Sequence, residues 1–267
     1  MSEDLHVLDV GSGPVVVLLH AFPCDGRMWE PQAAGLVTAG WRIIVPDLPG
    51  FGRSALLREA PSLEGVTSRI VEHLAVKGVD RCVLGGVSLG GYIAMAIMRA
   101  APQLVGGVML CDTKATADSA QARENRERLA VLCVDAPDDC GRILEQAVLP
   151  GLLGDTTRAQ RPDVVARVRG WLNDAEADTV AWYQRAMAQR PDSVSVLEAS
   201  AAPALVVWGE EDALSPRAEQ ELMISALPDA VLETVPGAGH LANVERPEVV
   251  TEAMRRFLDA VRDPQTS

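Results

Sequence analysis

The chain has 267 residues, of which 48% are hydrophobic and 23% charged, a composition typical of a folded protein with a packed core. Its formal net charge of −13 argues against nucleic acid or an anionic membrane as a partner, since both attract clustered lysine and arginine. The four histidines and five cysteines follow no metal-ligand spacing, so the sequence also predicts no metal site.

The amino-terminal stretch MSEDLHVLDV contains two early acidic residues and lacks the basic and then apolar order of a signal peptide. No apolar run reaches the roughly 18 residues that span a bilayer. The cysteines are odd in number and scattered, without a CxxC pair. We therefore expect a cytoplasmic protein with reduced thiols.

The first half of the chain alternates short apolar runs with helical patterns. Residues 5–19 predict an antiparallel hairpin at one sheet edge, because two apolar runs flank a short Gly/Pro turn. Near-continuous apolar runs predict four buried strands, at 15–20, 41–46, 81–86 and 104–112. The intervening helical patterns end at Gly or Pro, which is the order of a parallel sheet with helices on both faces.

Residues 113–200 are rich in Arg, Glu, Asp and Ala and show helical patterns without a convincing strand. The alternation of strands and helices resumes at residue 203 and continues to about residue 261. The chain is therefore predicted to have an α/β core, interrupted by a helical insertion. Its predicted parts are a core at 1–112 and 201–262, a helical cap at 113–200, and a frayed tail at 263–267.

A serine lies between glycines where the third of the buried strands gives way to a helix. Gly86, Ser88 and Gly90 match the pattern GxSxG, in the sequence GGVSLGG. This pattern is typical of a nucleophile on a sharp turn between strand and helix. A serine at a helix start can equally serve as an N-cap that accepts a backbone N–H. The choice depends on a base and an acid elsewhere in the chain.

Two later segments supply both, and with them the chain resembles the α/β-hydrolase family over nearly its whole length. LVVWGEEDALSP is similar to the acid loop of that family, and VPGAGHLANVERPE to its histidine loop. The resemblance implies a catalytic triad of Ser88, Asp212 and His240, in the family's chain order. Asp112, after the preceding strand, is the alternative acid, because some relatives carry the acid there. The family's sheet implies seven or eight strands, mostly parallel, with the cap inserted after strand 6.

These residue types suit acyl transfer. Histidine takes the proton of the serine as it attacks, and the carboxylate orients the imidazole and stabilises its charged form. The resemblance assigns the oxyanion hole to the backbone amides of Phe22 and Leu89, where one donor is typically worth about 2.7–4 kcal/mol. The sequence departs from the family at His20 and Ala21, where relatives usually have His-Gly, so the loop that carries Phe22 is expected to shift.

The substrate pocket is predicted from large side chains of the cap and of the core below it. The cap contributes Trp171, Trp182, Tyr183 and Met187, and the core contributes Phe22 and Trp29. The alternative for each cap residue is that it anchors the cap to the core, since apolar residues at helical spacing usually do so.

The loops resemble the group of carboxylesterases, enol-lactonases and cofactor-free perhydrolases. That resemblance implies hydrolysis of a small-molecule ester or lactone through an acyl-enzyme on Ser88, without a cofactor. C–C bond hydrolysis or perhydrolysis with the same triad is an alternative. A different class is a binding protein that holds a small ligand in the capped pocket without turnover. The sequence leaves the oligomeric state open.

Overall fold

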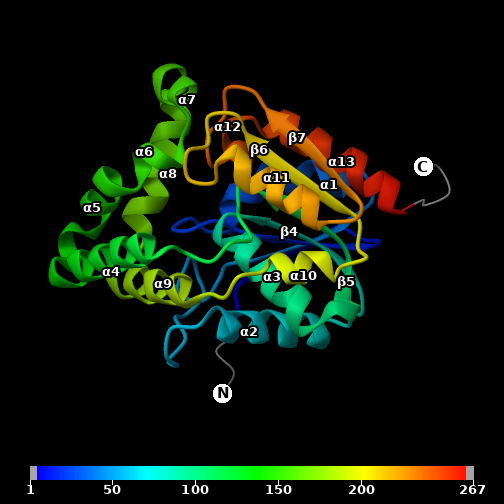
Figure 1. Ribbon diagram of the computed structural model, residues 1–267, viewed down its shortest axis with the longest axis horizontal. Helices are drawn as coiled ribbons and strands as arrows, with labels where there is room; N and C mark the ends of the chain where they lie inside the picture. Colours follow the sequence, from blue (N-terminus) through cyan, green and yellow to red (C-terminus); the bar gives the residue numbers. More distant parts are fainter. Residues whose placement is uncertain (1–4, 263–267) are drawn as a thin grey trace.

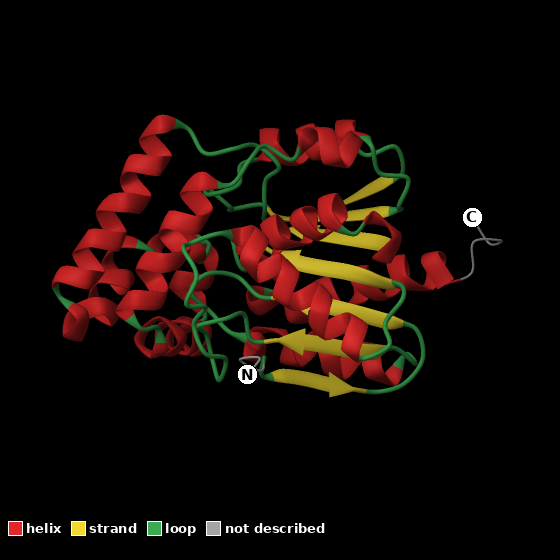
Figure 2. Ribbon diagram, turned by 90° about the horizontal axis from the view of Figure 1, so that it is seen from below, coloured by secondary structure: helices red, strands yellow, loops and turns green. Residues whose placement is uncertain are grey.

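A seven-stranded sheet forms the centre of the protein, in the spatial order β1-β3-β2-β4-β5-β6-β7 (Figure 1 and Figure 2). The structure is a computed structural model that describes residues 5–262, and the tail expected at 263–267 lies outside the described residues. The strands are β1 (Val7–Val10), β2 (Val15–Leu19), β3 (Arg42–Pro46), β4 (Cys82–Val87), β5 (Val105–Cys111), β6 (Ala204–Gly209) and β7 (Ala230–Val235).

The apolar runs of the sequence form the interior of this sheet. Strands β2 to β5 coincide with the four predicted buried runs to within one residue at either end. Every residue of β4, β5 and β6 is buried, because helices cover both faces. Neighbouring strands from β3 to β7 run parallel, and β1 alone is antiparallel. The predicted α/β fold with a mostly parallel sheet is confirmed, with seven strands among the described residues.

The predicted amino-terminal hairpin is wrong. Strand β1 pairs antiparallel with β3, whereas β2 pairs parallel with β3 and β4, so β3 lies between the first two strands. The turn between β1 and β2 crosses the start of β3. There Gly11 has a φ of 82°, and a Cβ on it would overlap the carbonyl oxygen of Trp41. Because of this close crossing, β1 lies on the far side of β3 from β2. The short turn alone had predicted that β1 and β2 would pair directly.

The helices form two layers on the sheet and a separate group beyond one end of its strands. One layer consists of α1 (Glu30–Thr38) and α13 (Pro247–Arg262), which pack on each other. The other layer is built from α2 (Leu63–Val76), α3 (Leu89–Ala100), α10 (Val194–Glu198) and α11 (Arg217–Ala226). The short helices η1 (Gly26–Trp29), η2 (Pro102–Leu104) and α12 (Ala242–Glu245) lie in the connections.

The separate group follows β5 and extends away from the sheet in Figure 1. It consists of α4 (Ala120–Asp135), η3 (Pro137–Asp139), α5 (Cys140–Ala147), α6 (Leu149–Leu152), α7 (Asp155–Gln160), α8 (Pro162–Asp174) and α9 (Ala177–Gln189). These helices pack mainly on one another. The insertion therefore follows the fifth strand of this sheet, and not the sixth as expected. The expected position counted one more strand before the insertion than the described residues contain. Helix α10, within the same stretch of sequence, packs on α3 and α11.

All five cysteines are buried as free thiols: Cys24, Cys82, Cys111, Cys133 and Cys140. Between residues 5 and 262, none of the helices combines the length and apolar character that crossing a bilayer requires.

Candidate active site

Ser88 stands at the sharp turn between β4 and α3. Its backbone has a φ of 52° and a ψ of −111°, in a region that side chains other than glycine rarely adopt. The Ser88 side chain makes no capping hydrogen bond to α3. Its Oγ instead lies 2.8 Å from Nε2 of His240. The N-cap alternative therefore does not describe this serine.

Two glycines allow the turn to pack so closely. A Cβ on Gly90 would overlap the carbonyl oxygen of Leu19 at the end of β2, and a Cβ on Gly86 would overlap the backbone of Gly90. Strand and helix can therefore meet only if these positions lack a side chain. The hydroxyl of Thr113, after β5, donates to the Ser88 carbonyl at 2.8 Å and holds the turn from the other side.

His240 lies between Ser88 and Asp212. Its Nδ1 is 2.8 Å from Oδ2 of Asp212, and both side chains are almost completely buried. Asp212 also accepts from the amides of Leu214 and Ser215, at 2.8 and 3.1 Å, and from the Ser215 hydroxyl. Because the carboxylate holds Nδ1–H as a donor, Nε2 of the neutral ring is left to accept the proton of Ser88.

The electrostatics of this group favour an ionised carboxylate beside a basic imidazole. Burial alone would raise the pKa of Asp212, but the charge of His240 and the hydrogen bonds from His240 and Ser215 lower it below its ordinary value. Burial would lower the pKa of His240, yet the charge and hydrogen bond of Asp212 outweigh it and raise that pKa. The imidazole is therefore a stronger base than an isolated histidine.

Asp112 has a different set of partners. It follows β5 with a φ of 43°, is fully buried, and accepts from the amides of Gly209 at 2.7 Å and Ala242 at 3.0 Å. Burial and the nearby charge of Asp212 raise its pKa. Its carboxylate connects the end of β6 to the segment after His240, and within residues 5–262 it forms no hydrogen bond with the imidazole.

Of the two predicted oxyanion donors, Leu89 directly follows Ser88 in the chain, and Phe22 lines the same cavity as Ser88. Leu89 is the first residue of α3, so its N–H lacks an acceptor within the helix. In the part of the chain that the structure describes, the Phe22 amide donates no hydrogen bond. His20 holds the Phe22 loop: its Nδ1 lies 2.9 Å from the Ala21 carbonyl, and its Nε2 accepts from the Leu48 amide at 2.9 Å. Burial lowers the pKa of His20, so the ring that makes these contacts is neutral.

A cavity of about 300 Å³ opens beside Ser88 and His240. Phe22 and Met187 line it, as predicted for both. Its other described walls come from α3, the segment after β5, α4, α6, α9 and the acid loop. The polar and aromatic side chains of these walls include Tyr92, Lys114, Asp118, Arg126 and Gln184. The sequence offered one signal for this polar wall: Lys114 lies three residues after the end of a buried strand, at the edge where sites form in parallel sheets.

Four of the predicted pocket residues do not line this cavity: Trp29, Trp171, Trp182 and Tyr183. Trp29 and Tyr183 are fully buried, and Tyr183 packs on Phe51 with ring centroids 4.8 Å apart. Trp182 donates from Nε1 to the Glu59 carbonyl at 3.0 Å. These contacts join α9 to the segment between β3 and α2. Trp182 and Tyr183 therefore anchor α9 to the core, which was the alternative prediction for these two residues.

Two glutamates that the sequence analysis left aside connect the insertion to the site loops. Glu245 is fully buried and accepts from the amides of Gly154 at 3.0 Å and Gly239 at 2.8 Å. Glu211 accepts from the Thr156 amide at 2.8 Å and from the Thr156 hydroxyl. The chain between α6 and α7 is therefore fixed to the segments that carry Asp212 and His240.

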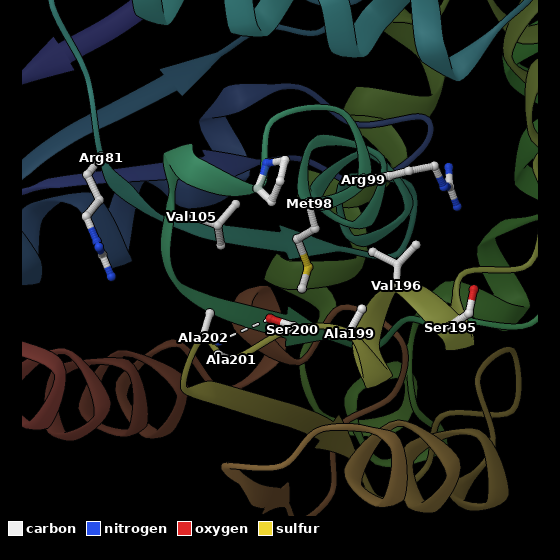
Figure 3. Close-up of a pocket in the computed structure, with 11 residues that line it drawn as sticks. Arg81, Met98, Arg99, Val105, Ser195, Val196, Ala199, Ser200, Ala201 and Ala202 are labelled. Atoms are coloured by element: carbon white, nitrogen blue, oxygen red, sulfur yellow. Dashed lines mark hydrogen bonds between the residues drawn. The ribbon is translucent and has the colours of Figure 1, made fainter.

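Another cavity, of about 520 Å³, lies away from these residues (Figure 3). Arg81, just before β4, and Val105, the first residue of β5, mark it as lying at the amino ends of the parallel strands. Ser88 follows the carboxyl end of β4, the edge at which sites in open α/β sheets form. None of the predicted site residues lines the Figure 3 cavity.

Comparison with known proteins gives concordant results. The model of the alpha/beta hydrolase family matches residues 16–253. A solved thermophilic esterase from Thermogutta terrifontis is 37% identical, with a TM-score of 0.92 over 97% of this chain and 94% of its own. The solved enol-lactonase from Burkholderia xenovorans LB400 is 25% identical, with a TM-score of 0.86 over 96% of each chain. A 2-hydroxy-6-oxononadienedioate/2-hydroxy-6-oxononatrienedioate hydrolase from Cupriavidus pinatubonensis is 26% identical over 95% of this chain and 90% of its own.

Proposed function

The chain belongs to the alpha/beta hydrolase family, and on that premise we propose that it is a serine hydrolase that cleaves a small carboxylic ester or lactone. Ser88 is the nucleophile, His240 the general base and acid, and Asp212 the residue that orients the imidazole. The single observation that carries this proposal is the continuous hydrogen-bonded line from Ser88 Oγ through His240 to Asp212, with 2.8 Å at each step.

In the first half of the proposed reaction, Ser88 Oγ forms a bond to the carbonyl carbon while its proton passes to Nε2 of His240. The negative charge that develops on the carbonyl oxygen is stabilised by the amides of Leu89 and Phe22. Collapse of the tetrahedral intermediate breaks the ester bond, and the leaving alkoxide takes the proton from His240. The acyl group then remains on Ser88.

In the second half, a water molecule gives a proton to His240 and attacks the acyl carbon. The bond to Ser88 Oγ breaks, the proton returns from His240 to that oxygen, and the acid is released. The raised pKa of His240 suits both directions of this transfer, because Asp212 stabilises the imidazolium that each step forms. The proposed steps require no metal or organic cofactor.

The surroundings of Ser88 favour a small substrate under a cap. The cavity of about 300 Å³ is at the lower end of the usual range for small-molecule sites. We propose that helices α4 to α9 form the cap, because α4 and α9 supply part of the cavity wall and Glu245 and Glu211 fix the segment near Gly154. Trp182 and Tyr183 secure α9 to the core beneath it.

Labelling with a fluorophosphonate tests the proposal. The probe should modify the native protein stoichiometrically, and peptide mass analysis should place the adduct on Ser88. Ser88→Ala should fold normally, remain unlabelled, and lose p-nitrophenyl ester hydrolysis by about 10⁴-fold or more. As a control, Ser62→Ala removes a hydroxyl outside the cavity and should leave labelling unchanged. A native protein that resists the probe and binds small ligands tightly without turnover would instead be a binding protein.

C–C bond hydrolysis by the same three residues is a second candidate, favoured by the similarity to the Cupriavidus hydrolase. Comparison of turnover on matched esters, lactones and 2-hydroxy-6-oxodienoates separates the two. Faster turnover of the oxodienoate would shift the proposal to C–C hydrolysis, with Ser88 still required.

A further inference from the structure

One wall of the cavity beside Ser88 carries an excess of positive charge in a protein whose net charge is −13. Lys114 and Arg126 line the cavity, and Arg190 lies just behind Tyr92, with its guanidinium 4.0 Å from the ring centroid. Asp118 is the single acidic side chain among the described residues that line this cavity. Three cations therefore surround one carboxylate.

The carboxylate of Asp118 forms an ion pair with Arg190, on the side away from the cavity. Its side chain is fully buried, and Oδ1 lies 2.8 Å from Nη1 of Arg190, whose own side chain is 5% exposed. Arg190 also donates to the carbonyls of Thr116 at 2.6 Å and Met187 at 3.2 Å. These contacts hold Arg190 in place as a buried counter-ion of Asp118. The charges and hydrogen bonds of Arg126 and Arg190 outweigh burial and lower the pKa of Asp118 to about 2, so its carboxylate stays ionised.

Lys114 and Arg126 retain donors beyond this pair. The Lys114 ammonium has three N–H donors and lies 3.4 Å from Asp118 Oδ1. Arg126 contacts Asp118 through Nε, and Gln184 and Met187 through Nη1 at 3.2 and 3.4 Å. Within residues 5–262, its Nη2 donates no hydrogen bond. Both side chains are about 20% exposed.

Neutralising Asp118 needs one cation, which the buried Arg190 supplies. Lys114 and Arg126 share this same carboxylate with Arg190, so three positive charges face one negative charge and the wall keeps an excess of two positive charges. Asp118 contacts both of them and limits their freedom, as a preformed anion site requires. Partly desolvated cations that retain N–H groups without an acceptor are suited to binding a carboxylate.

We propose that Lys114 and Arg126 bind a carboxylate of the substrate, so that the ester or lactone cleaved at Ser88 is itself an anion. This inference rests on the proposed function and names its substrate class. A charge-assisted contact of this kind is expected to favour the anionic substrate by about tenfold to a hundredfold in kcat/KM.

Paired esters test the preference. Mono-p-nitrophenyl succinate, glutarate and adipate carry a carboxylate at increasing distance on the acyl side, and p-nitrophenyl butyrate, valerate and hexanoate are their uncharged counterparts. On the leaving-group side, 4-acetoxybenzoate is compared with its methyl ester. At least one anionic ester should exceed its neutral counterpart by tenfold or more.

The variants Lys114→Met and Arg126→Gln should each reduce this preference by about tenfold and leave the neutral esters within about threefold. The matched control is Arg123→Gln, which removes an exposed cation from the same helix as Arg126, outside the cavity lining. Thermal unfolding of each variant checks that it folds. A preference for the neutral ester in every pair, or one unchanged by both cavity variants, overturns the inference while ester hydrolysis itself stands.

If no ester or lactone is turned over, the proposed function fails, and binding still tests the cavity. Ser88→Ala protein is titrated calorimetrically with glutarate and with glutaramide. Binding of glutarate alone, lost when Arg126→Gln is added, supports the anion site. Absence of glutarate binding at millimolar concentration overturns it.

Discussion

Asp112 and Asp212 are buried carboxylates at the ends of neighbouring parallel strands, and their partners separate them. Asp212 meets the imidazole of His240 and a hydroxyl, whereas Asp112 meets two backbone amides. A carboxylate that faces an imidazole changes the basicity of that ring, whereas one that faces amides holds segments of chain together. From the residue types alone the two were alternatives.

Substitution with asparagine should distinguish the two carboxylates. Asp212→Asn should reduce kcat by the order of 10⁴-fold, because the amide no longer holds the correct tautomer of His240. Asp112→Asn should retain most activity and lower the free energy of unfolding by about 1–3 kcal/mol, since one buried amide loses its acceptor. Ester kinetics and urea unfolding measure the two effects. Strong inactivation by Asp112→Asn with a mild effect of Asp212→Asn would reverse the assignment.

The pH dependence of the reaction depends on the same contact. As the proposed base, His240 must be neutral to accept a proton, so kcat/KM should rise with pH through the pKa of its imidazole. Asp212 raises that pKa above the ordinary 6.5, and the midpoint of the acid limb is expected above pH 6.5. In Asp212→Asn, NMR titration of the His240 ring should show a lower pKa than in the native protein, whereas the exposed Glu210→Gln should show no change. A native midpoint below 6.5 contradicts this account.

At the scale of elements, the insertion meets the segments that carry Asp212 and His240 through two carboxylates, those of Glu211 and of the buried Glu245. Helix α12 places Glu245 where it accepts amides from two separate stretches, one between α6 and α7 and one just before His240. The sequence did not predict this role, because Glu245 begins the polar stretch ERPE and no local pattern distinguishes it from a solvated glutamate. Its burial depends on the approach of a segment some 90 positions earlier.

Glu245→Gln should loosen this junction. A glutamine keeps the volume but loses one acceptor, so a buried amide of Gly154 or Gly239 is left unsatisfied, at a cost of about 1–3 kcal/mol in unfolding free energy. We expect faster proteolysis between α6 and α7 and a lower kcat, because Gly239 precedes the base. The control is Glu248→Gln on the exposed first turn of α13. Equal stability and protease resistance in both variants would show that the junction does not depend on Glu245.

At the scale of the whole molecule, continuous apolar runs predicted the interior strands of the sheet. The grouping of Ser88, Asp212 and His240 was implied by the resemblance to the family's loops, and the structure brings the three side chains together. The place of β1 was not predictable in this way, because β3 enters between two strands that are adjacent in sequence. The cavity wall was also missed: α4 is polar around most of its circumference, and nothing local marks which arginine faces inward.

All five native thiols are buried, which makes it convenient to attach a label to the molecule at one introduced cysteine. Burial raises the pKa of Cys82 and of Cys133 to about 12, so neither thiol ionises readily at neutral pH. A single surface substitution such as Arg123→Cys on α4 therefore supplies the sole readily accessible handle for a maleimide fluorophore. Attached there, the dye reports motion of the inserted helices during turnover without background from the wild-type chain.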